Sequence, residues 1–180
     1  MPDLVADVQA IFWDHIFPMG HYNRNQTLKN VHIDPKKIEH WAMNDIVSKY
    51  PFLHPHLLVF TLPANFATNI HMDGLGTEKT TRRYSCNIPI EGCNENCITE
   101  FFEVDYAKFV ADVPSTTRFL KPGTEISKLA EYRLTTNPIL TDTQFPHRVN
   151  NRASDVRRVS VSWTIDHKNW SWEQIANIVA

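Results

Sequence analysis

Two histidines and one aspartate stand at spacings that suit a metal site. Residues two positions apart in a β-strand point to the same face, so the side chains of His71 and Asp73 can converge while Met72 turns away. His147 follows 74 positions after Asp73, enough chain for several strands to bring it back beside the first pair. Two imidazoles and one carboxylate on one side of a metal leave its opposite positions open to small molecules. The alternative is that His71 and Asp73 only hydrogen-bond to each other at a strand end.

The segment after His147 indicates a second site, for an anion. Alternation along a strand places three polar residues on one face, Arg158, Ser160 and Ser162, and three apolar residues on the other, Val159, Val161 and Trp163. If the polar face points inward, the guanidinium needs an anion, because a buried unpaired charge is costly. A dicarboxylate held by the guanidinium and a serine hydroxyl would meet that need. The competing interpretation places Arg158 on a solvated face.

Together these residues resemble the motif of the Fe(II)- and 2-oxoglutarate-dependent oxygenases. The match consists of His71 and Asp73, the distal His147, and the Arg-x-Ser pattern of Arg158 and Ser160, which begins eleven positions after that histidine. It covers residues 57–165. The resemblance implies that the triad is a catalytic Fe(II) site, that Arg158 and Ser160 bind the far carboxylate of 2-oxoglutarate, and that O2 is consumed.

A further predicted strand, at residues 83–90, is similar to the strand of this family that often carries a Tyr or an Asn in contact with the co-substrate. Tyr84 and Asn87 are therefore additional candidates for 2-oxoglutarate binding. Alternation places them on opposite faces, so both point inward only if a bulge intervenes. Arg157 should face away from Arg158, and the Arg-x-Ser pattern favours Arg158.

The activity implied by the resemblance is oxidation of an unactivated C–H bond, with hydroxylation favoured over demethylation or another oxidation. The carboxylate of Asp73 argues against halogenation, because halogenating relatives carry a small residue there. The substrate would be a small molecule or a side chain of a peptide or protein. Two other classes stay open: a cupin-like metal protein that does not use 2-oxoglutarate, and a non-catalytic β-sandwich binding module.

The elements that must position these residues are mainly β-strands. Runs of β-type residues, broken by Pro, Asn, Asp and Gly, predict eight strands, at residues 57–62, 68–72, 82–90, 98–104, 117–120, 126–134, 145–149 and 156–165. No helical pattern separates them, which is typical of an antiparallel jelly roll. The resemblance implies the same fold, a cupin-like double-stranded β-helix with its core at about residues 57–166.

Helical spacing predicts flanking helices over residues 4–16 and 38–46 and at the C-terminus. Ser171 and Gln174 have the spacing of a capping box for the last of these helices. His54 and His56 have the spacing of a cupin metal pair, but Pro55 disfavours a central strand there.

Composition points to a single domain over residues 1–180. The net charge of -2 and the isoelectric point of about 6.5 do not indicate the excess of basic residues that is typical of nucleic-acid binding. No long apolar run predicts a membrane span, and Asp3 and Asp7 stand where a secretory signal would be basic, so we expect a cytoplasmic protein without a membrane partner.

An odd set of three cysteines favours reduced thiols, although Cys93 and Cys97 could form a redox pair or half a zinc site. The oligomeric state stays open.

Overall fold

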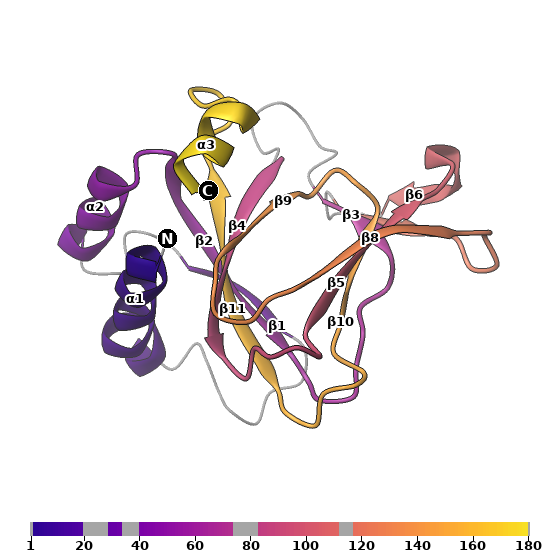
Figure 1. The fold of residues 1–180 in the computed structure, drawn as a ribbon, viewed down its shortest axis with the longest axis horizontal. Helices are drawn as coiled ribbons and strands as arrows, with labels where there is room; N and C mark the ends of the chain where they lie inside the picture. Colours follow the sequence, from indigo (N-terminus) through magenta and orange to yellow (C-terminus); the bar gives the residue numbers. More distant parts are fainter. Residues whose placement is uncertain (1, 20–28, 34–39, 74–82, 112–116, 180) are drawn as a thin grey trace.

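Two antiparallel β-sheets face each other and enclose the interior of the molecule (Figure 1). The computed structural model describes residues 2–19, 29–33, 40–73, 83–111 and 117–179. The first sheet has the strand order β1 (Lys29–Ile33), β2 (Leu53–Leu62), β11 (Arg158–Ile165), β4 (Tyr84–Glu91) and β9 (Ile139–Asp142). The second sheet has the order β6 (Phe109–Ala111), β7 (Arg118–Leu120), β3 (His71–Met72), β10 (His147–Asn150), β5 (Ile98–Glu103) and β8 (Ser127–Arg133).

Helices cover the outer face of the first sheet. These are α1 (Pro2–Ile11), which continues into a π-helical turn η1 (Phe12–Ile16) and a 3-10 turn η2 (Phe17–Met19), together with α2 (His40–Lys49) and α3 (Trp172–Val179). Figure 1 shows α1 and α2 beside the first sheet, away from the second. Phe12, Ile46 and Ile175 belong to one buried cluster with Trp163 of β11. A further 3-10 turn, η4 (Tyr106–Lys108), precedes β6.

Strand β11 carries the alternation on which the site depends. Its apolar residues, Val159, Val161 and Trp163, are completely buried in the cluster beneath the helices. Its polar residues, Arg158, Ser160 and Ser162, are buried on the opposite face, toward the second sheet. A strand with a helix layer on one side and a second sheet on the other buries both of its faces. The inward direction of Arg158 is thereby confirmed, and the solvated alternative is wrong.

The mainly β fold with helices at both ends is confirmed, and all eight predicted strands are present with shifted ends. Strands β1, β6 and β9 were not predicted. The C-terminal capping box is also confirmed: the Gln174 amide donates to the Ser171 hydroxyl at 3.3 Å, and the Ser171 amide donates to the Gln174 side chain at 2.8 Å. The predicted helix over residues 38–46 is α2, and positions 38 and 39 lie outside the described residues.

Pro55 lies inside β2, a central strand, contrary to the expectation that proline would exclude this segment from one. Strand β1 pairs with β2 only from Leu57 to Thr61, and the pairing with β11 shifts register between Trp163 and Ile165. Proline is tolerated there because, among the described residues, that part of the strand has no partner on one side, and the pairing on the other side has a bulge.

The cysteines are free thiols, as expected. Cys93 and Cys97 follow Gly92, whose φ of +64° begins the turn after β4. A Cβ at Gly92 would lie 1.9 Å from the Arg157 carbonyl oxygen, so this turn requires glycine. Among the described residues, no helix has the length and apolar character needed to span a membrane.

Candidate metal centre

The structure brings His71, Asp73 and His147 together. One ligand atom from each lies within 4.8 Å of the other two. His71 Nε2 is 3.9 Å from Asp73 Oδ1. The sequence separates His147 from the pair, but β10 runs antiparallel beside β3 and places His147 directly opposite His71. Short strand β3 thus supplies one ligand itself and a second from the residue that follows it.

Both imidazoles are oriented by a backbone carbonyl two residues earlier in the chain. His71 Nδ1 lies 2.8 Å from the carbonyl oxygen of Asn69, and His147 Nδ1 lies 2.8 Å from that of Phe145. A carbonyl oxygen only accepts, so each neutral ring carries its proton on Nδ1 and has a lone pair on Nε2. Outer contacts of this kind accompany histidine ligands in metal sites. Both rings are therefore set to bind a metal through Nε2.

A buried arginine lies in the same pocket as the triad. Arg158 is 2% exposed, and its Nε and Nη1 atoms are buried with no hydrogen-bond partner among the described residues. Burial lowers the pKa of the Arg158 guanidinium, an effect that Cys93, Cys97 and Tyr132 oppose. An arginine remains protonated at neutral pH all the same. Its unpaired donors provide a site for an anion.

The neighbouring Arg157 has a different environment. Its Nη2 donates to Glu91 Oε1 at 2.8 Å, and the carboxylate of Glu91 balances the positive charge of Arg157. Arg157 therefore does not present its charge to the pocket, whereas Arg158 does.

Hydroxyl and amide groups form the wall between the arginine and the triad. Asn87 links the strands of the first sheet: its Oδ1 accepts from the Ser162 hydroxyl at 2.5 Å and its Nδ2 donates to Thr141 Oγ1 at 2.8 Å. Thr141 also shares a hydrogen bond with the Tyr132 hydroxyl of β8, which joins the two sheets. Ser160 lines the same pocket. These side chains provide hydrogen-bonding groups for a polar ligand beside Arg158.

Only one of the two candidates on β4 faces this pocket. Asn87 lines it, whereas Tyr84 packs against the cluster beneath the helices, with its ring 5.1 Å from that of Trp172. The residues alternate without a bulge that would turn both inward, because Tyr84 and Asn87 keep one continuous register with β9. Tyr84 is therefore not brought to the pocket that contains Arg158.

Sequence reasoning did not find Tyr132 and Thr141. Burial raises the pKa of the Tyr132 hydroxyl, which keeps it protonated and able to donate. Tyr132 of β8 lies opposite Thr99 of β5, and Thr99 lines the pocket. The only signal in the sequence was the tyrosine at an inward position of a predicted strand.

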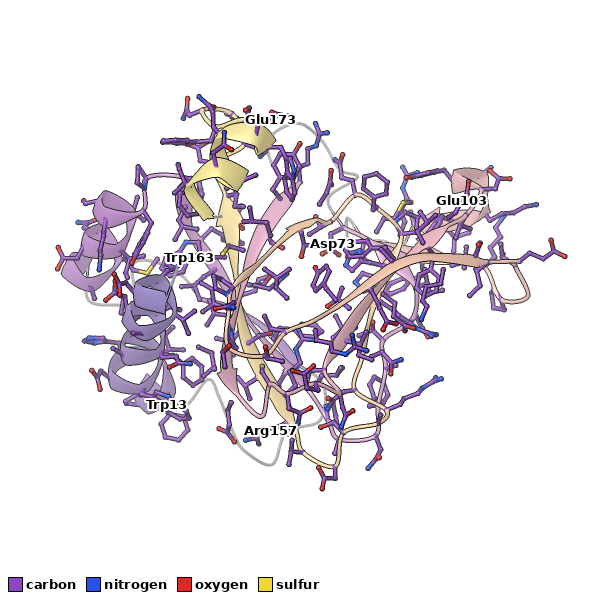
Figure 2. All side chains as sticks on the ribbon, viewed as in Figure 1. Trp13, Asp73, Glu103, Arg157, Trp163 and Glu173 are labelled. Carbon is purple, nitrogen blue, oxygen red and sulfur yellow. The ribbon has the colours of Figure 1, made fainter. Side chains whose placement is uncertain are left out.

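Taken together, the donor set suits a divalent transition metal with open positions, and the free Nε and Nη1 donors of the Arg158 guanidinium suit a carboxylate. Figure 2 shows Asp73 on the side of the second sheet, near β3, and Trp163 on the side of the first sheet nearer the helices. The pocket between the sheets can thus hold a metal at one place and the anionic end of a small molecule at another.

No protein-family model and no curated protein sequence matches this chain. Among solved structures, it is similar to a prolyl-4-hydroxylase of Pseudomonas putida, with 15% identity and a TM-score of 0.47 over 91% of this chain and 86% of that one. A DMSP lyase, DddQ from Ruegeria pomeroyi DSS-3, aligns with 10% identity and a TM-score of 0.31 over 93% and 92% of the two chains. CapF, in complex with the inhibitor 3-isopropenyl-tropolone, aligns with 13% identity and a TM-score of 0.35 over 60% of this chain but only 24% of its own. The pocket's own residues and their setting between two sheets agree with the resemblance to the Fe(II)- and 2-oxoglutarate-dependent oxygenases.

Proposed function

We propose that the protein is an Fe(II)- and 2-oxoglutarate-dependent oxygenase that hydroxylates an unactivated C–H bond. The observation that carries this proposal is the pairing, in one pocket, of the His71, Asp73 and His147 triad with the buried guanidinium of Arg158, whose Nε and Nη1 atoms have no hydrogen-bond partner among the described residues. A metal protein that did not bind an anionic co-substrate would have no use for that guanidinium, and leaving it unpaired would cost stability.

Each group in the pocket has a defined part in this reaction. The triad would hold Fe(II) through the two Nε2 atoms and the carboxylate, with 2-oxoglutarate and O2 using the open positions. Arg158 and Ser160 would bind the far carboxylate of 2-oxoglutarate, and Asn87 would line its path. Iron and 2-oxoglutarate together supply the oxidising power, while the protein supplies orientation and the exclusion of water.

The substrate is a small molecule or a side chain of a peptide or protein, and the reaction is proposed to take place in the cytoplasm. The pocket wall around Arg158 is polar, so the co-substrate occupies that part. The prime substrate must approach the metal from another side.

The test is an anaerobic titration of the Fe(II)-loaded protein with 2-oxoglutarate, followed by visible absorption. Chelation of Fe(II) by the 1-carboxylate and 2-keto oxygen is expected to give a weak charge-transfer band, which should be absent in His147→Ala. Bound iron without this band would contradict the proposal and favour a cupin-like metal protein of another activity. Failure to bind iron at all would favour a non-catalytic module.

A further inference from the structure

Five neighbouring strands of the second sheet place one residue each in a row through the metal site. Paired residues on antiparallel strands share a face. The pairings run from β6 to β5 and join, in order, Val110, Phe119, His71, His147 and Phe101. The ring centroids of Phe119 and His71 are 6.0 Å apart, and those of His147 and Phe101 are also 6.0 Å apart. The two metal-binding rings therefore lie between two phenylalanines.

Along this row, exposure increases from His147 to the exposed Val110 at the hairpin end. His147 is 5% exposed, whereas the Asp73 side chain is 25% exposed and Val110 is 45% exposed. Phe119, between His71 and Val110, is half-buried. The metal site therefore opens toward the β6–β7 hairpin. Figure 1 shows this hairpin beside β3, at the side of the molecule remote from α1 and α2.

The opposite end of the row is half-buried, in contrast to the exposed Val110. Phe101 packs on Tyr132, with ring centroids 5.5 Å apart, and Tyr132 is tied to Thr141 of the other sheet. Beyond them lies the polar region around Arg158, which the co-substrate would fill. A second reactant therefore has to reach the metal from the hairpin side.

The two faces of the hairpin differ in what they contact. Its outer face contributes Phe109 and Leu120 to a cluster with Met72. Its inner face presents Val110 and Phe119, which belong to neither of the hydrophobic clusters formed by the described residues. Arg118, the charged residue of β7, pairs with Met72 and so shares the outer face. The inner face is thus apolar, carries no charge of its own, and adjoins the metal.

We infer that the inner face of the β6–β7 hairpin, formed by Phe119 and Val110, binds the prime substrate and selects an apolar group next to the carbon that is oxidised. This inference rests on the proposed function, because it takes the reacting carbon to lie beside the metal. An aliphatic or aromatic group placed there would cover exposed apolar surface of both residues. A charged group there would lose hydration without gaining a partner from these two side chains.

The test uses Mn(II)-loaded protein, to which either benzyl alcohol, a soluble aromatic probe, or glycerol, a polar probe, is added. The NMR linewidths of the two probes are then compared. Paramagnetic broadening falls steeply with distance from the metal, so it reports only on probe molecules held close to it. In wild type, the ring protons of benzyl alcohol should broaden much more than those of glycerol. Zn(II)-loaded protein provides the diamagnetic baseline.

Phe119→Ser and Val110→Ser should each weaken binding of benzyl alcohol about tenfold, the scale of one lost apolar contact in a binding pocket. Leu129→Ser is the matched control: Leu129 is 56% exposed on β8, the strand at the other edge of the same sheet, and its replacement should leave the broadening unchanged. Val110→Ser also serves if Phe119→Ser fails to fold, because Val110 is already exposed.

The outcomes separate this inference from the proposed function. If water relaxation shows that Mn(II) does not bind, the metal centre is wrong and the inference fails with it. If Mn(II) binds and 2-oxoglutarate displaces its water, but benzyl alcohol is not broadened by the wild type, or is broadened as strongly by both hairpin variants as by the wild type, only the substrate-binding face is overturned.

Discussion

His71 and His147 lie directly opposite each other on adjacent strands, with their ring centroids 4.4 Å apart. Each ring is held by the backbone carbonyl two residues before it, of Asn69 and Phe145 respectively. The same local arrangement therefore occurs on both strands and turns both Nε2 atoms toward one point. Two of the three proposed metal ligands are therefore oriented by backbone contacts of the protein.

Removal of any member of the triad should abolish metal binding. His71→Ala, Asp73→Ala and His147→Ala are each expected to weaken Fe(II) or Mn(II) affinity by more than about 100-fold, since loss of outer contacts alone costs 10- to 100-fold in metal sites. The measurement is metal affinity by isothermal titration calorimetry without oxygen. His54→Ala is the control, because its side chain is exposed outside the site. Unchanged affinity in all three ligand variants would contradict the assignment.

The two adjacent arginines should respond differently to substitution. Arg158→Gln is expected to leave metal bound but to weaken 2-oxoglutarate about 10- to 100-fold, the effect of losing charge-assisted hydrogen bonds. Arg157→Gln breaks the ion pair with Glu91 and should leave 2-oxoglutarate affinity nearly unchanged. Both affinities are measured calorimetrically on the Mn(II)-loaded protein. Equal losses in the two variants would mean that Arg158 does not bind the co-substrate.

Asn87 and Tyr84 provide a second matched pair on one strand. Asn87→Ala removes the link between Ser162 and Thr141 and should weaken 2-oxoglutarate binding about 3- to 10-fold, the scale of one neutral hydrogen bond. Tyr84→Phe should have no effect on this affinity, because the ring faces the helices. The same titration checks both variants, and a loss confined to Tyr84→Phe would reverse their roles.

Glu100 should contribute stability that depends on pH. Burial alone would raise the pKa of its carboxyl, but hydrogen bonds from Arg148 and Asn150 outweigh burial and hold that pKa below its ordinary value. A depressed folded-state pKa gives stability that is complete above the unfolded value of 4.5 and is lost as pH falls through the folded value. Glu100→Gln should therefore lower the free energy of unfolding by about 1–3 kcal/mol at neutral pH, and by less in acid.

Urea unfolding at neutral pH and below the unfolded pKa of Glu100 measures this difference. Glu131→Gln is the control, because the carboxyl of Glu131 pairs with the exposed Lys128 and its loss should matter much less. A destabilisation by Glu100→Gln that stays constant across the pH range would show that the charge of Glu100 is not its source.

Much of the site could be predicted from the sequence because its signals are local. His71 and Asp73 follow strand periodicity, and the alternation from Arg158 to Trp163 sorts inward from outward residues once one face is known to be apolar. The pairing of His147 with this group needed the family motif, because no local rule states which strands become neighbours. The structure supplied that relationship as the register between β3 and β10.

What the sequence could not provide depends on contacts between the sheets. Strand β9 is only four residues long and follows a proline, and β6 is three residues long, so neither has a clear period. Thr141 and Tyr132 meet because β9 and β8 are edge strands of different sheets. The choice between Tyr84 and Asn87 likewise depended on which face of β4 the helices cover.

Strand β3 has only two residues, and its register with β10 consists of the single pair His71 and His147. In the order of the second sheet, β6 and β7 connect to the remaining strands only through β3. Metal occupancy and the order of this hairpin are therefore thermodynamically linked: a metal ion that joins His71 to His147 closes a long chain loop and also raises the free energy of local opening of β7 and β6. Binding of a metal would thus stabilise the hairpin face that is proposed to bind the substrate.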